Sequence, residues 1–175
     1  FNPVDRLPLV EVVRGDQTDD AVLQRAMSFV TQIGKLPLPC RSAPGFVVNR
    51  ILAPYLLEAL RAHEEGAALE TIDKAATDFG MPTGPMELAD RVGLDIALHV
   101  TEILGSEAPE SLRAKVEAGE LGAKTGKGFY EFERNRPRKA DEFPEPDADL
   151  QDRLILALVN EAMACYEHGV IDDLD

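Results

Sequence analysis

The sequence predicts a mainly α-helical protein that begins with a short βαβ unit. From residue 44 onward, apolar side chains recur at helical spacing in one segment after another, and glycine or proline separates the segments. Ahead of residue 44, two short apolar segments with prolines flank one amphipathic stretch, which is the order strand, helix, strand.

The βαβ unit is predicted from three consecutive segments. Residues 1–13 are expected to be extended, because their prolines exclude a helix and their apolar side chains alternate with period two. A helix is expected to start at Thr18 or Asp19, which are good N-caps, and to end at Gly34. Residues 36–40 then form a second strand. Two parallel strands make a weak sheet, so the unit is expected to be the end of a larger α/β domain.

The rest of the chain is predicted to be helical, with one loop and one linker. Helices are expected at 50–66, 69–79, 86–92, 94–104, 111–118 and 150–166. The glycine-rich residues 119–132 are expected to form a loop, and residues 133–149, which are rich in proline and charge, are expected to form a linker.

The helix at 150–166 resembles the helix at 50–66. A shift that places Arg50 on Arg153 also places Gly66 on Gly169 and aligns most of the apolar positions. Two interpretations remain open at this point. Either a second helical repeat starts at residue 150, or two amphipathic helices are similar by chance.

Composition excludes several classes of protein. The 175 residues carry 18 Lys and Arg against 32 Asp and Glu, a net charge of −14, which argues against nucleic acid or an anionic membrane as a partner. No apolar run is long enough to span a membrane. Two cysteines cannot form a disulfide framework, so a reducing compartment is expected. The chain starts at Phe1 without a signal-peptide pattern and is interpreted as a piece of a longer protein.

Two polar residues stand in apolar surroundings. Glu11 lies on the same strand face as Leu9 and Val13, so it is either an exposed edge charge or a buried carboxylate that needs a cationic or hydrogen-bonding partner. Asn49 lies near a helix start in the segment FVVNRILA, in which most neighbours are apolar. Asparagine is a poor helix former. It either faces solvent or binds a partner with its amide.

No metal or nucleotide motif is present in the sequence. The three histidines and two cysteines lie far apart, so no zinc site is expected. Residues 122–128 fail the spacing of a phosphate-binding P-loop, and no GxGxxG occurs. A local group of basic residues at 124–139 either faces a phosphorylated ligand or belongs to a solvated linker.

Four motifs together resemble one family. The segments FNPVDRLPLVEVV, PGFVVNRIL, FGMPTGPMELADRVGLD and KTGKGFYEF occur in this order along nearly the whole chain. They are similar to the (3S)-3-hydroxyacyl-CoA dehydrogenase family, and the extension past the last motif resembles the multifunctional fatty-acid oxidation proteins. The resemblance implies that 1–43 ends an NAD-binding Rossmann domain and that 44–132 is the helical C-terminal domain. Residues 133–149 would be a linker, and 150–175 would start a second helical repeat.

The resemblance also implies roles for three residues. Glu11 matches the carboxylate that orients and charges the catalytic histidine, and Asn49 matches the catalytic asparagine beside the substrate. Asn2 matches a position that contacts NAD. The family's histidine stands two positions before Phe1 and is absent, as are the NAD fingerprint and the acidic ribose-binding residue. The 175-residue chain is therefore expected to be inactive alone, with NAD bound mainly by an upstream domain.

The implied function is oxidation of (3S)-3-hydroxyacyl-CoA to 3-oxoacyl-CoA with NAD in fatty-acid β-oxidation. The implied setting is a cytoplasmic, multifunctional homodimer, with a thiolase subunit as a further partner in a fatty-acid oxidation complex. Two alternatives remain open: a 3-hydroxybutyryl-CoA dehydrogenase, and a non-catalytic helical module for dimerisation or interaction, which the acidic surface would also suit.

Overall fold

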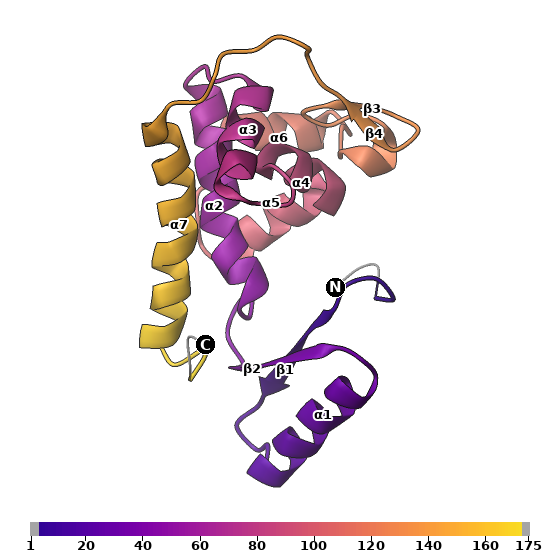
Figure 1. Cartoon of the computed structure of the whole chain (residues 1–175), viewed down its shortest axis with the longest axis vertical. Coiled ribbons are helices and arrows are strands. Elements are labelled where there is room, and N and C mark those ends of the chain that lie inside the picture. The colour runs from indigo at the N-terminus through magenta and orange to yellow at the C-terminus, as the bar shows by residue number, and fades with distance from the viewer. Residues whose placement is uncertain (1–3, 173–175) are drawn as a thin grey trace. The chain divides into compact units, whose positions relative to one another are not determined.

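The computed structural model describes residues 4–172 and contains two compact units. Unit 1 comprises residues 1–50 together with 162–175, and unit 2 comprises residues 51–161. Helices account for most of the regular structure, and the strands are short (Figure 1). The predicted fold class, mainly α with a βαβ unit at the start, is therefore confirmed.

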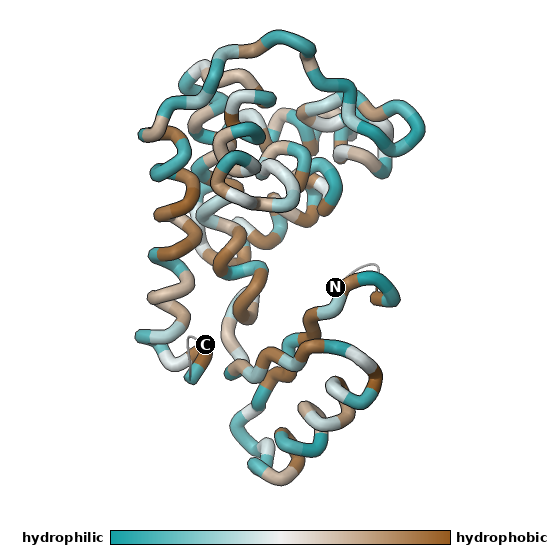
Figure 2. Tube along the Cα trace, in the orientation of Figure 1, coloured by the Kyte–Doolittle hydropathy of each residue, from teal (hydrophilic) through white to brown (hydrophobic). Residues whose placement is uncertain are grey.

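Unit 1 contains the predicted βαβ unit. Strand β1 (Leu9–Arg14) pairs in parallel with β2 (Leu36–Arg41), and helix α1 (Asp20–Gln32) connects them. Both strands are mostly apolar (Figure 2). Asp19 occupies the N-cap position as predicted, but its side chain makes no capping hydrogen bond. The hydroxyl of Thr18 instead accepts a hydrogen bond from the Gly15 amide at 3.1 Å, which tightens the turn before the helix.

Unit 2 is built from consecutive helices around one apolar core. The helices are α2 (Val48–Glu64), α3 (Leu69–Phe79), α4 (Pro85–Val92), α5 (Leu94–Ile103) and α6 (Glu110–Glu117). Their bounds follow the predicted segments closely, because each helix is followed by a glycine or a proline-containing turn. The largest fully buried apolar side chains of this core are Tyr55, Leu60, Ile72, Met86, Leu94, Leu112 and Leu154.

The segment after α6 is more ordered than the predicted loop and linker. A short 3-10 helix (Ala123–Thr125) precedes strand β3 (Glu131–Glu133), which pairs antiparallel with β4 (Arg136–Arg138). Arg134 and Asn135 form the two-residue turn, both with positive φ, as such hairpins require. The turn is hydrophilic in Figure 2. Residues 133–149 therefore contain strand β4 and the first two residues of the next helix.

Helix α7 (Ala148–Glu167) follows, two residues longer at its start than predicted, and Gly169 with φ 66° lies just after its end. In unit 2, Leu154 of α7 joins the apolar core, and Arg153 forms hydrogen bonds with Glu58 and Glu65. Other apolar side chains of α7 are exposed, among them Leu156 at 54%. The second helical repeat stays a prediction.

Candidate active site

The carboxylate of Glu11 holds the N-terminus of α2. Its Oε1 atom accepts hydrogen bonds from the backbone amides of Val47 and Val48, both at 2.9 Å. These amides would otherwise lack partners, because the first turn of a helix has no preceding carbonyls. The positive end of the helix dipole also favours a carboxylate there. Glu11 is half-buried and has hydrogen-bonding partners, so of the two interpretations the structure favours the carboxylate with a partner over the exposed edge charge.

The connection from β2 to α2 turns sharply before it meets Glu11. Gly45 has a φ of 75° and Phe46 a φ of 48°. Residues other than glycine rarely adopt a positive φ. Val47 directly after them is buried at 4% exposure, which anchors the turn. The backbone amides of residues 47 and 48 thereby face the strand that carries Glu11.

Asn49 is the second residue of α2 and follows directly after the two amides that Glu11 holds. Its side chain is exposed and makes no hydrogen bond within residues 4–172. The structure therefore brings the carboxylate of Glu11 to the helix start that carries Asn49, although the two residues are 38 positions apart (49 minus 11). Asn2, the third predicted site residue, lies outside the described residues.

The other reactive side chains of the described chain do not extend this site. Burial, with a smaller contribution from the charge of Glu11, raises the pKa of Cys40 to about 11, so its thiol stays protonated. Cys40 and Cys165 are both buried, and neither forms a disulfide within residues 4–172. No group of three His, Cys, Asp or Glu within residues 4–172 could hold a metal ion. No helix in this range is both long and apolar enough to cross a membrane.

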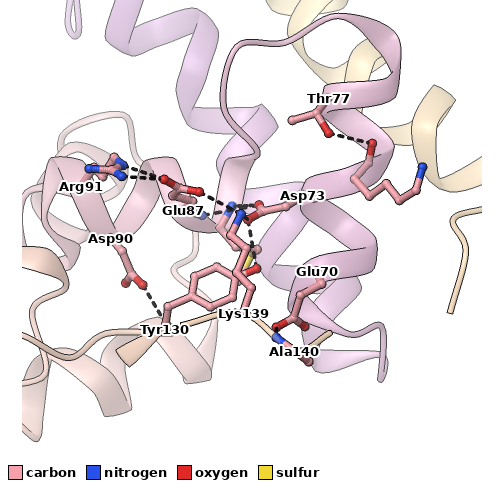
Figure 3. A network of polar contacts seen from close by, with 11 residues as sticks. Glu70, Asp73, Thr77, Glu87, Asp90, Arg91, Tyr130, Lys139 and Ala140 are labelled. Carbon is pink, nitrogen blue, oxygen red and sulfur yellow. Dashed lines mark hydrogen bonds and ion pairs between the residues drawn. The ribbon is translucent and has the colours of Figure 1, made fainter. Parts of the chain in front are cut away.

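A second polar network, in unit 2, escaped the sequence-based reasoning (Figure 3). Asp73 of α3 is 2% exposed, and its Oδ1 accepts from the amide of Met86 at 2.8 Å and from that of Glu87 at 3.4 Å, at the start of α4. Its Oδ2 accepts from the Tyr130 hydroxyl at 3.0 Å and from Lys139 Nζ at 3.1 Å. Burial raises the pKa of Asp73, although these donors oppose the rise.

Asp90 plays a similar part at the end of α4. Its two oxygens accept from the amides of Phe129 at 2.9 Å and Tyr130 at 2.8 Å, in the last of the four motifs. A Cβ atom at Gly128 would lie 1.9 Å from Asp90 Oδ1, so only glycine fits there. All four carboxylate oxygens of Asp73 and Asp90 accept from donors of this unit, so the network holds the motifs together.

The local basic group is largely neutralised by acidic neighbours of the same unit. Lys139 Nζ lies 2.8 Å from Glu87 Oε2, and Lys127 Nζ lies 2.6 Å from Glu120 Oε1. Lys124 pairs with Asp95 at 2.5 Å. These pairs favour a structural role over a phosphate site.

Family comparisons agree with the four motifs. Residues 45–132 match the model of the 3-hydroxyacyl-CoA dehydrogenase C-terminal domain, which is half of the chain. The chain belongs to the 3-hydroxyacyl-CoA dehydrogenase family. Residues 1–43 match the model of the family's NAD binding domain. The family resemblance drawn from the motifs is thus confirmed.

Relatives within the family include a fatty acid oxidation complex subunit alpha from Shewanella loihica, 36% identical over 98% of this chain and 27% of that protein. The chain therefore spans about a quarter of the length of this relative. The solved 3-hydroxybutyryl-CoA dehydrogenase from Escherichia coli K12 is 37% identical, with a TM-score of 0.72 over 85% of this chain and 33% of that one. The dehydrogenase part of a Caenorhabditis elegans multifunctional enzyme is 26% identical, with a TM-score of 0.64 over 99% of this chain and 44% of that one.

Proposed function

We propose that this chain supplies one side of the active site of an NAD-dependent (3S)-3-hydroxyacyl-CoA dehydrogenase. The enzyme would oxidise the 3-hydroxyl group of an acyl-CoA to a 3-oxo group in fatty-acid β-oxidation. The observation that carries the proposal is the contact between Glu11 and the start of α2, where one carboxylate oxygen holds two amides directly before the exposed Asn49.

Glu11 is proposed to support the catalytic histidine of the family. Its Oε1 is committed to the amides of Val47 and Val48, so Oε2 is the oxygen that can accept a hydrogen bond from an imidazole N–H. The histidine takes the proton of the substrate hydroxyl and becomes a cation. A carboxylate at fixed distance stabilises that cation and keeps the ring in the orientation that proton transfer needs.

Asn49 is proposed to bind the oxygen of the reacting group. Its amide N–H groups can donate to the 3-oxygen as that atom changes from a hydroxyl to a carbonyl oxygen. A donor placed in advance at this position lowers the barrier because it need not reorganise during the reaction. The exposure of the side chain fits a ligand as its partner, because nothing else within residues 4–172 occupies it.

NAD would accept the hydride from C3 of the substrate, but the described residues do not form its phosphate site. Phosphates bind at helix N-termini that are rich in glycine and free of acidic side chains. Helix α1 of the βαβ unit instead starts at Asp20, which pairs with Arg14 at 2.8 Å, and Asp19 precedes it. We therefore expect no measurable NAD binding by the 175-residue chain in isothermal titration calorimetry; micromolar binding would contradict this assignment.

The proposal is tested with the full natural product of the gene that encodes this chain. Reduction of NAD with a 3-hydroxyacyl-CoA substrate is followed by absorbance for the wild type and for Asn49→Ala. We expect kcat to fall roughly 10²-fold or more in this variant, as for the loss of one preorganised donor. Asn160→Ala changes an exposed asparagine of α7 and is the matched control with unchanged turnover. Equal turnover of both variants would show that Asn49 does not take part in catalysis.

A short acyl chain is a second candidate for the substrate. The solved Escherichia coli relative is a 3-hydroxybutyryl-CoA dehydrogenase and matches 85% of this chain. Comparison of kcat/KM for 3-hydroxybutyryl-CoA with that for a long-chain 3-hydroxyacyl-CoA decides between the two substrate classes. A preference for the four-carbon substrate would favour the short-chain enzyme.

We also propose that the protein acts in the cytoplasm as a homodimer, in a complex with a thiolase subunit. The support is its similarity to the alpha subunits of fatty acid oxidation complexes. Light scattering of the full natural protein measures the first association, and co-purification from the source cell measures the second. A monomer without a thiolase would contradict both.

A further inference from the structure

The start of α2 is held from a second direction by the residues that follow α7. These residues, 168–172, are called the return segment here. The amide of Arg41, the last residue of β2, donates to the carbonyl oxygen of Val170 at 2.8 Å. Arg41 Nη2 also lies 3.3 Å from Asp172 Oδ1. Arg50 Nη2 lies 2.9 Å from His168 Nδ1. All of these residues belong to unit 1.

The return segment is a built part of unit 1. Val170 is 4% exposed, and Cys165 in the last turn of α7 is fully buried. Gly169 takes a φ of 66°, and the amides of Val170 and Ile171 both turn back to the carbonyl oxygen of Cys165. The helix end therefore fixes where His168 lies relative to Val170.

The return segment contacts the chain on both sides of the turn that leads into α2. On one side it binds Arg41, and on the other side it binds Arg50, the residue next to Asn49. Glu11 holds the amides between these two points. The segment around Asn49 is thus fixed at three places, two of which depend on residues 168–170.

The contact with Arg50 does something that Glu11 cannot do. Glu11 binds two backbone amides ahead of Asn49 with a single oxygen, whereas His168 binds a side chain of the helix itself, directly after Asn49. Arg50 is the next residue of the helix, so its contact with His168 lies within the helical turn that carries Asn49. A misplacement of about 1 Å can cost a large factor in rate when a donor must meet a reacting atom.

We propose that His168 is a positioning residue for Asn49, acting through Arg50. The proposal rests on the function proposed above, in which Asn49 binds the reacting oxygen. Arginine is always charged and donates, so His168 accepts with the lone pair of Nδ1 and carries its proton on Nε2. His168 itself touches neither substrate nor cofactor.

The test compares three variants of the full natural gene product. His168→Ala removes the acceptor, His168→Asn offers an amide oxygen close to the position of Nδ1, and His99→Ala changes an exposed histidine of α5 as the matched control. The readouts are kcat, KM for the acyl-CoA, and hydrogen exchange of the amides of residues 46–50.

We expect kcat of His168→Ala to fall roughly 10-fold with KM changed less than about twofold, because the group that meets the reacting oxygen is misaimed while the rest of the substrate still binds. Exchange should rise in residues 46–50 only. His168→Asn should recover most of the turnover, and His99→Ala should match the wild type. Unchanged kcat, or a uniform rise of exchange throughout the protein, would overturn the proposal.

This design separates the two proposals. If the wild type does not oxidise 3-hydroxyacyl-CoA, the proposed function fails and hydrogen exchange alone is decisive. Faster exchange confined to residues 46–50 in His168→Ala would then support the positioning of the α2 start, and unchanged exchange would overturn it. If the wild type is active and His168→Ala is equally active, the positioning role fails and the function stands.

Discussion

Asp73 and Glu11 both hold the start of a helix, and they do so with different completeness. Asp73 binds the start of α4, is almost fully buried, and uses both oxygens on donors from α4, Tyr130 and Lys139. Glu11 binds the start of α2, is half-buried, and uses one oxygen. The same capping chemistry thus serves a closed structural network in one unit and leaves a free acceptor beside an exposed asparagine in the other. The proposed function makes use of this difference, because the second oxygen of Glu11 is the one assigned to the histidine.

The largest effect is expected from removal of Asp73. Asp73→Ala leaves two amides and the buried Tyr130 hydroxyl without their acceptor and takes one of two carboxylate partners from Lys139, which should lower the free energy of unfolding by about 3–5 kcal/mol. Urea unfolding followed by circular dichroism measures it. Asp78→Ala removes an exposed aspartate of the same helix and should cost less than about 0.5 kcal/mol. Similar losses in the two variants would show that the buried network contributes little.

Replacement of Glu11 should separate activity from stability. Glu11→Gln keeps an oxygen for the α2 amides but loses the charge, so we expect roughly a 10²-fold lower kcat, about 2.7 kcal/mol in activation free energy. The free energy of unfolding should change by less than about 1 kcal/mol. Turnover of the full natural protein and urea unfolding together test this. A variant that unfolds readily but turns over normally would reverse the proposed division between the two carboxylates.

A smaller loss is expected from Gly128→Ala. The new Cβ would lie 1.9 Å from Asp90 Oδ1 and 2.7 Å from the Cα atom of Gly122, so the loop or Asp90 must shift, at about 2–3 kcal/mol. Gly15→Ala is the matched control, because its Cβ would meet only the Thr18 hydroxyl at an ordinary 3.6 Å. Thermal unfolding of both variants measures the difference, and equal melting temperatures would mean that the motif around Asp90 is loosely packed.

The smallest effect is expected from Lys139→Met, and it should depend on pH. Lys139 is partly exposed, so the loss of its ion pairs with Asp73 and Glu87 should cost about 1–2 kcal/mol near pH 7. Burial works to raise the pKa of Glu87, but Lys139 and Arg91 outweigh it and the pKa is lowered.

The sign of the pH effect follows from these two carboxylates. The stabilisation through Glu87 is present above the pKa of an unfolded glutamate and disappears as the pH falls through the lower folded value. The pKa of Asp73, already raised by burial, should rise further without Lys139. As the pH falls, Asp73 should therefore be protonated in Lys139→Met before it is protonated in the wild type, which removes the cost of burying an unpaired charge. The difference in free energy of unfolding between the wild type and Lys139→Met, measured by urea unfolding, should therefore become smaller from about pH 7 to about pH 4. A difference that grows on acidification would contradict this account. Lys74→Met, which removes the exposed ion pair with Asp78, serves as the control.

The sequence predicted the elements of this fold better than the contacts between them. Helix α3 coincides with the predicted 69–79, because its apolar spacing and the following Gly80 are local signals. Glu11 could be singled out from strand alternation alone. Its partners could not, because the amides of Val47 and Val48 carry no side-chain signature.

Asp73 and Asp90 were missed for the same reason. Their donors are mainly backbone amides 13 to 40 positions further along the chain, and periodicity does not report such pairs. The available signal was indirect: Gly84 and Gly128 leave no room for a Cβ beside these two aspartates. The hairpin inside the predicted linker was hidden because Arg134 and Asn135 lack the glycine that usually marks such a turn.

The contacts of Arg41 and Arg50 with the return segment have a consequence for synthesis of the protein. Unit 1 is discontinuous in sequence, since residues 51–161 lie between its two parts. When residues 1–50 have left the ribosome, Glu11 and Asn49 are already present. His168 and Val170, which bind Arg50 and Arg41, have not yet been synthesised. Domains fold as they emerge, at about 5–20 residues per second, so unit 2 can form first. The surroundings of Asn49 then become complete only after translation has passed residue 170.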